Sequence, residues 1–224
     1  ALRRYAERMH EYLDAVHAGM SPEGLAALRE DLRIDRILSD LSPLIEGTIE
    51  GAERTRDIVD GLKRFSAIDR DENKSLDLVE VVERAVRWVT KAAREQFRVS
   101  LSLPVSLPVS GSAGQLQQVV MNLVQNACDA TADIEAPSLE IVAEILGDEV
   151  QLRFFDNGPG IGPAHLPHVF DPFFTTKPVG KGTGLGLAIS YGIVERHRGS
   201  LRAENRPEGG AVFTLSLPRD RAAR

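Results

Sequence analysis

A strict three-four spacing of apolar and small residues over positions 41–62 requires a long helix that packs along a partner helix. The spaced positions are Leu41, Ile45, Thr48, Ala52, Thr55, Val59 and Leu62. This is the pattern of a coiled-coil seam, and the small residues in it indicate close packing. Pro43 lies within the pattern, so it either bends the helix or marks its true start.

An apolar stripe near the start of the chain predicts a shorter helix that ends near Gly19. Its members alternate spacings of three and four: Leu2, Tyr5, Met9, Tyr12 and Val16. Ser21 and Pro22 can then begin a second helical stretch. One helix pair leaves much of its apolar face uncovered, so we expect residues 1–70 to form a hairpin of the dimeric four-helix-bundle type. A helix that packs only on its own domain is the alternative.

The composition excludes several classes of function. The 224 residues include 27 Lys and Arg against 33 Asp and Glu, a net charge of −6, which gives no electrostatic footprint for nucleic acid and no basic patch for a membrane surface. The single cysteine, Cys128, excludes an internal disulfide and a cysteine-based zinc site. No apolar run reaches the roughly 18 residues of a spanning helix, so we expect a cytoplasmic chain without membrane contact of its own. The chain begins without Met and in helical phase, so we expect a fragment whose parent can still be membrane-anchored.

A change of pattern after the long helix predicts a second domain. The polar run 69–75 has no apolar anchor and indicates a linker, which divides the chain into residues 1–70 and 71–224. Further elements follow from periodicity and turn residues: helices over 78–92, 115–130 and 187–198, the last stopped by Gly199, and strands over 97–103, 138–145, 149–155, 200–204 and 211–217. Ser112 to Gln115 has the form of a capping box. Together these elements predict an α+β fold, a mixed sheet with helices on one face.

Three stretches of the second domain carry residues suited to ligand binding. Asn122 and Asn126 lie four apart on one helix face, although a satisfied structural pair would look the same. Residues 154–162 leave a strand and enter a glycine-rich turn with Asp156 at its first bend, so backbone could approach a ligand beside a carboxylate. Residues 180–186 are a glycine-rich stretch that opens a helix, an arrangement suited to phosphate but also to a plain connection.

In this order the stretches resemble the ATP-binding domain of the GHKL superfamily, which includes sensor histidine kinases, gyrase, mismatch-repair ATPases and a chaperone class. The matching segments are Gln117–Ala127 (N box), Asp156–Gly160 (G1 box), Val169–Lys177 (F box) and Gly182–Leu187 (G2 box). The Thr-Thr-Lys of the F box and residues 192–199 are similar to histidine kinases rather than gyrase. The resemblance covers about residues 75–218 and implies a GHKL α/β sandwich.

The resemblance implies a role for individual residues. It assigns Asn126 to Mg²⁺ and Asp156 to the adenine amino group, which favours ATP over GTP. It places Gly158 and Gly160 against the base, and makes Gly182, Gly184 and Gly186 the hinge of a lid. The other ATP-binding residues that it implies are Asn122, Asp129, Ile161, Phe170, Thr183 and Leu185. Lys177 either adds positive charge near the phosphates or is a solvated lysine of the lid.

Asn122 bears on the reaction type. Relatives that hydrolyse ATP carry Glu at this position, and an amide cannot act as a general base. We therefore expect a protein histidine kinase that transfers the γ-phosphoryl group to a histidine, for relay to an aspartate of a response regulator receiver domain. An ATP-gated scaffold or pseudokinase without phosphotransfer is the alternative, and an ATPase is the third possibility.

The phosphoacceptor histidine is missing from its expected place. Residues 34–65 resemble the second helix of a dimerisation and histidine-phosphotransfer domain, but no His-Glu-x-x-x-Pro-Leu string precedes them. His10 with Glu11 is a partial match, in which Ala15 stands in place of proline. We expect that the acceptor precedes this sequence and that His10 is an ordinary surface histidine; His10 as the phosphoacceptor itself is the alternative. We also expect no chemistry from His165 or His168, and interpret Trp88 as a core residue.

Overall fold

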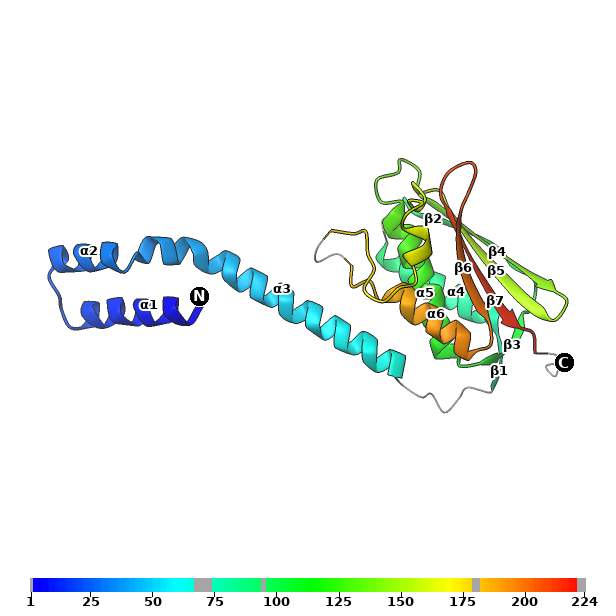
Figure 1. Ribbon diagram of the computed structural model, residues 1–224, viewed down its shortest axis with the longest axis horizontal. Helices are drawn as coiled ribbons and strands as arrows, with labels where there is room; N and C mark the ends of the chain where they lie inside the picture. Colours follow the sequence, from blue (N-terminus) through cyan, green and yellow to red (C-terminus); the bar gives the residue numbers. More distant parts are fainter. Residues whose placement is uncertain (1, 67–73, 94–95, 179–181, 221–224) are drawn as a thin grey trace. The chain divides into compact units, whose positions relative to one another are not determined.

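The computed structural model describes residues 2–66, 74–93, 96–178 and 182–220 (Figure 1). The chain divides into two compact units, residues 1–57 and 58–224. The domain boundary expected near residue 70 lies outside the described residues, as does most of the expected linker.

The first unit is helical. Its elements are α1 (Leu2–His17), α2 (Pro22–Asp31) and the start of α3 (Ile34–Ser66). The first helix ends where the sequence predicts, and Ser21 caps α2 by accepting a hydrogen bond from the Gly24 N–H at 3.2 Å. Helix α3 begins nine residues before Pro43, so that proline does not mark its start.

A small core joins α1 to the helices that follow it. Leu32, Ile34 and Ile37 are buried and pack against apolar side chains of α1 and α2, namely Tyr5, Met9, Tyr12 and Leu28. The Tyr5 hydroxyl also donates to Asp40 at 2.8 Å. The middle of the apolar stripe of α1 therefore packs within the unit, whereas its end residues Leu2 and Val16 are 40% and 41% exposed. Ile45 of the predicted seam is 45% exposed. The side chains of Val59 and Leu62 lie outside the described residues.

The second unit contains a five-stranded mixed sheet in the order β2-β4-β5-β7-β6. Its strands are β2 (Arg98–Ser102), β4 (Ser138–Leu146), β5 (Glu149–Asp156), β6 (Ser200–Asn205) and β7 (Ala211–Pro218). Strand β2 runs parallel to β4, and the other neighbours are antiparallel. The predicted hairpin is present, with Gly147 of its turn at a φ of 64°.

Three helices cover one face of this sheet (Figure 1): α4 (Leu78–Ala92), α5 (Ala113–Ala130) and α6 (Gly186–Arg196). Burial alternates along β5, so every second side chain enters the core. Fully buried Phe154, Ile141 and Leu152 of the sheet belong to one cluster with Leu123 and Ile193 of the helices. Each such side chain stabilises the fold by roughly 1.5–3 kcal/mol. The α+β prediction is confirmed, but Trp88 of α4 is 68% exposed, so its interpretation as a core residue was wrong.

A second, two-stranded sheet was not predicted. Strands β1 (Lys74–Asp77) and β3 (Pro108–Gly111) pair antiparallel. Lys74 and Ser75 are exposed, so the strand carries no apolar alternation that could mark it. Asp77 ends this strand and caps α4, because its Oδ1 accepts hydrogen bonds from the N–H groups of Val79 and Leu107, both at 2.9 Å. Desolvation acts to raise the pKa of Asp77, but hydrogen bonds to its carboxylate together lower that pKa.

The end of α6 differs from the prediction. The helix stops at Arg196, and the residue in the left-handed region is Arg198, at a φ of 57°, rather than Gly199. Gly199 is required for another reason, since a Cβ there would lie 2.2 Å from the Ser216 carbonyl oxygen of β7.

His197, directly after α6, holds this helix to the start of α5. Its Nε2 accepts a hydrogen bond from the Ser112 N–H at 3.0 Å, and its Nδ1 lies 2.8 Å from the Ile193 carbonyl oxygen. Only the neutral ring with its proton on Nδ1 satisfies both contacts. Ser112 in turn caps α5 by accepting from the Gln115 N–H, whereas Gln115 Oε1 is buried without a partner in the described chain. The capping box is therefore formed in one direction only.

Candidate functional site

Asp156, the last residue of β5, is a buried residue whose carboxylate has one oxygen hydrogen-bonded to backbone N–H groups. The residue is 4% exposed, and its Oδ1 accepts hydrogen bonds from the N–H groups of Gly158 at 2.9 Å and Ala211 at 3.1 Å. No donor within the described residues reaches Oδ2. Oδ2 is not a fully buried atom, so it is available to a donor supplied by a ligand.

The turn after β5 approaches its neighbours too closely for side chains. A Cβ on Gly158 would lie 3.1 Å from the Ala130 carbonyl oxygen at the end of α5. Gly160 has a φ of 78°, a conformation that glycine adopts without strain. Asn205 of β6 holds the turn: its Oδ1 accepts from the Ile161 N–H at 2.7 Å, and its Nδ2 donates to the Ile161 carbonyl at 2.6 Å.

Gly210, directly before β7, fixes the backbone of Asp156 and was not predicted from the sequence. It has a φ of 85°, and a Cβ there would lie 2.1 Å from the Asp156 carbonyl oxygen. Arg206 donates to the same carbonyl oxygen at 3.2 Å. Neither contact has a signal in the sequence, because both depend on the fold bringing residues about 50 positions apart together.

The Asn122 side chain of α5 is hydrogen-bonded to the first turn of α6. Its Nδ2 donates to the Gly186 carbonyl oxygen at 3.0 Å and to Ser190 Oγ at 3.1 Å. Ser190, which is buried, donates to that same Gly186 oxygen. The side chain thus joins the helix of the N box to the helix that follows the G2 box, and it offers no carboxylate that could take a proton.

Asn126 and Asp129, one turn apart on α5, both contact the Lys177 ammonium group. The distances from Lys177 Nζ are 3.4 Å to Asn126 Oδ1 and 2.5 Å to Asp129 Oδ2. Gln125 Nε2 donates to the other Asp129 oxygen at 2.8 Å. The Asn126 oxygen therefore faces a cation, which is the chemistry that a hard divalent metal would require of it.

The F and G2 boxes support each other through two residues with positive φ. Phe173 has a φ of 69° and donates its N–H to the Gly184 carbonyl at 2.9 Å. Gly184 has a φ of 66°, and a Cβ there would lie 2.3 Å from the Phe173 carbonyl carbon. Nearby, the Phe170 ring packs on Tyr191 of α6 with 5.4 Å between centroids. Leu185 is buried in the core, and Thr183 Oγ1 accepts from its N–H at 3.4 Å.

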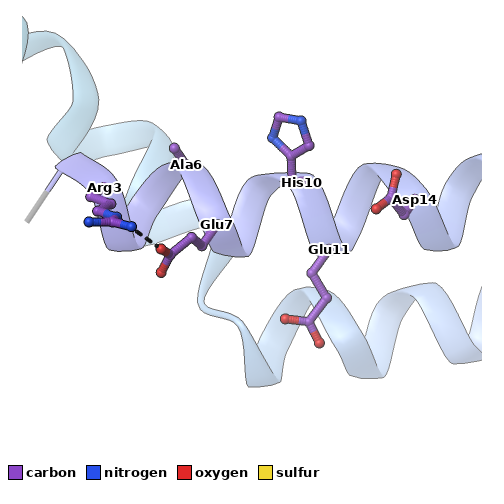
Figure 2. A pocket seen from close by; sticks show the side chains of 6 residues that line it. All are labelled: Arg3, Ala6, Glu7, His10, Glu11 and Asp14. Atoms are coloured by element: carbon purple, nitrogen blue, oxygen red, sulfur yellow. Dashed lines mark ion pairs between the residues drawn. The ribbon is translucent and has the colours of Figure 1, made fainter.

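None of the contacts described above for the site involves a histidine. His10 is exposed on the polar face of α1 in the first unit, on an open depression lined only by α1 side chains, and no hydrogen bond joins it to Glu11 (Figure 2). His165 and His168 lie beside the Phe174 ring, and His168 Nδ1 contacts Asp171 at 2.7 Å. No group of three or more His, Cys, Asp or Glu within the described ranges could hold a metal ion.

This arrangement defines a nucleotide-binding class of domain: a mixed sheet backed by helices, with a buried aspartate turn, an asparagine face and a glycine-rich stretch at a helix N-terminus. Residues 111–221 match the model of the histidine kinase-, DNA gyrase B-, and HSP90-like ATPase family. The two-component sensor PprA of Pseudomonas aeruginosa is 47% identical over 115 residues, which are 49% of this chain and 12% of PprA.

Solved structures of histidine kinases are similar as well. The catalytic domain of histidine kinase ThkA is 31% identical, with a TM-score of 0.60 over 66% of this chain and 96% of that domain. ThkA in complex with the response regulator protein TrrA is 25% identical, with a TM-score of 0.61 over 98% of this chain and 62% of ThkA. The chain belongs to the sensor histidine kinases, and its residues 111–221 match their ATP-binding domain.

The match is partial in length. The chain spans 12 to 36% of the length of the curated relatives that it matches. Within the described ranges, no helix has both the length and the apolar character needed to cross a membrane.

Proposed function

We propose that this chain binds ATP with Mg²⁺ and transfers the γ-phosphoryl group to a histidine, from which it passes to an aspartate of a response regulator. The partner is supported by the ThkA complex, which contains a response regulator protein. The single cysteine is in keeping with a cytoplasmic, reducing location, where ATP is available.

Adenine recognition is assigned to Asp156. The Oδ2 oxygen can accept the exocyclic amino group of adenine, while Oδ1 stays held by two backbone N–H groups. With guanine the same oxygen would face a carbonyl oxygen, and a buried carboxylate left unpaired disfavours that ligand. Gly158, Gly160 and Ile161 line the turn that approaches the base.

Asn126 is assigned to the metal, since its carboxamide oxygen already accepts a hydrogen bond from the Lys177 ammonium group. Mg²⁺ would neutralise charge on the phosphates. The phosphates themselves are assigned to the N-terminus of α6, where Gly184 and Gly186 leave backbone N–H groups accessible.

Asn122 is the observation that carries the choice of a kinase over an ATPase. A general base contributes roughly 10² to 10⁴ to a rate, and this amide cannot act as one. Its hydrogen bonds to Gly186 and Ser190 instead give it a positioning role at the start of α6. The phosphoryl group is thus reserved for an external nucleophile.

Residues 1–70 are assigned to dimerisation as a helical hairpin, and residues 71–224 are assigned to catalysis. Exposed apolar side chains on α3, among them Leu38, Ile45 and Ile49, support this assignment. His10 is not assigned as the phosphoacceptor histidine, because it lacks the H-box context.

A calorimetric titration tests the nucleotide site. Asp156→Asn is expected to weaken ATP binding by about 5- to 150-fold, the loss of one buried charged acceptor, while the far-ultraviolet circular dichroism spectrum stays the same. Glu140→Gln, an exposed carboxylate on β4, is the matched control and should bind like the wild type. Unchanged ATP affinity in Asp156→Asn, or equal affinity of the wild type for GTP, would refute the assignment.

A further inference from the structure

Lys177 is held beside the metal-assigned oxygen by contacts with α5 and with its own F-box segment. Its ammonium group pairs with Asp129 and reaches Asn126, and its N–H donates to Thr175 Oγ1 at 3.2 Å. The Lys177 and Asp129 side chains are each only about one-third exposed, 34% and 35%. Of the two alternatives that the sequence allows for Lys177, the solvated lysine of the lid does not agree with these contacts.

Gly182 gives this lysine room to lie along the site. A Cβ on Gly182 would lie 3.3 Å from both Cβ and Cδ of Lys177, and 2.7 Å from Thr175 Oγ1. The φ of Gly182 is not in the left-handed region, so its backbone conformation does not by itself require glycine. The first glycine of the G2 box instead removes a side chain from the path of the lysine stem.

Asp129 is fixed on both oxygens, one by Lys177 and the other by Gln125. This bracing orients the carboxylate on the same face of α5 as Asn126, one turn away. Without the ammonium group, a carboxylate oxygen and a carboxamide oxygen would face the same space. Both are ligands that hard divalent cations accept.

We propose that Lys177 is a tethered cation that fills the metal position beside Asn126 and must move before a divalent ion can bind there. The proposal rests on the assignment of Asn126 under the proposed function. It makes the Lys177–Asp129 pair a determinant of metal binding: the ammonium group excludes the free divalent ion, and phosphates that attract Lys177 away from Asp129 make the position available. Metal and nucleotide then bind together.

The first test measures binding of Mn²⁺, without nucleotide, by electron paramagnetic resonance. Lys177→Met keeps most of the stem and removes the charge, so it is expected to bind Mn²⁺ at least about fivefold more tightly than the wild type. This lower limit is the interaction of unit charges 4 Å apart in bulk water. Lys91→Met on α4 makes the same charge change at an exposed position and should leave Mn²⁺ binding at the wild-type level. Lys177→Arg should also keep the wild-type level.

The second test measures amine acylation of the wild type residue by residue with mass spectrometry, again without nucleotide. Lys177 should react more slowly than Lys91, and Asp129→Asn should raise its rate by up to about fivefold, as expected for a partly exposed ion pair. Asp133→Asn, an exposed carboxylate that follows α5, is the charge-matched control and should leave that rate unchanged.

Equal Mn²⁺ binding by Lys177→Met and Lys91→Met would overturn the proposal. The proposal would also be overturned if Asp129→Asn, like the control Asp133→Asn, left the acylation rate of Lys177 unchanged. Neither measurement involves nucleotide, so loss of ATP binding in Asp156→Asn tests the proposed function separately.

Discussion

Gly210→Ala is the substitution that most directly tests how the fold positions Asp156. The added Cβ would lie 2.1 Å from the Asp156 carbonyl oxygen and 2.9 Å from its carbonyl carbon. Both neighbours are backbone atoms, so no side-chain rotation can relieve the overlap, and the strand end that carries the carboxylate must shift.

Gly209→Ala is a matched control from the same turn. Gly209 also has a positive φ, of 101°, but a Cβ there would meet nothing within 4 Å. Its cost is backbone strain alone, about 1–2 kcal/mol. Gly210→Ala adds an overpacking cost of about 1–3 kcal/mol, for a total of roughly 2–5 kcal/mol.

Urea unfolding and calorimetric titration with Mg-ATP would measure both consequences. Gly210→Ala should lower the free energy of unfolding by more than Gly209→Ala, and should weaken ATP binding by about 5- to 150-fold as the carboxylate leaves its ligand. Gly209→Ala should bind ATP with the wild-type affinity. If the two variants matched in stability and in ATP affinity, the argument that Gly210 positions Asp156 would be refuted.

Two further predictions concern stability. Asp77→Ala should lower the free energy of unfolding by about 0.5–2 kcal/mol at pH 7, through loss of the helix cap. Because the folded-state pKa of Asp77 is lowered, its contribution is present above the unfolded-state pKa of about 3.9 and is lost as the pH falls through the folded-state value. The difference from the wild type should shrink in unfolding curves taken toward pH 3, and a constant difference would contradict this. His197→Ala should lower the free energy of unfolding by about 1–3 kcal/mol and speed hydrogen exchange at the Ser112 amide, because that N–H loses its acceptor. Unchanged exchange at Ser112 would contradict the role of His197 in holding α6 to the start of α5.

The elements that the sequence predicts well are those with a strong apolar period. The alternation along β5 and the three-four stripes of α4 and α5 follow directly from which side chains enter the core. Strand β1 has no such period, because Lys74 and Ser75 are exposed and only Leu76 packs against the core. Its pairing with β3 is set by the chain fold rather than by its own residues.

Some residues of the candidate site can likewise be predicted from a local sequence pattern, and others cannot. Asp156, Asn122 and Asn126 are visible in the sequence because each lies within a local pattern of residues. Gly210 and Asn205 are not, because each acts on a residue more than 40 positions away. Gly199 was noticed as a helix stop, but its actual constraint is the approach of a β7 carbonyl oxygen, which no local pattern indicates.

The most direct test of the central claim is a phosphorylation assay on the longest gene product that contains this sequence, with Mg-ATP labelled on the γ-phosphate. We expect a protein-bound phosphoryl group that is lost in mild acid, survives alkali and forms more slowly in Asp156→Asn at ATP concentrations below saturation. Release of free phosphate at a substantial rate, with no acid-labile label on the protein, would contradict the assignment of Asn122 to a kinase rather than an ATPase.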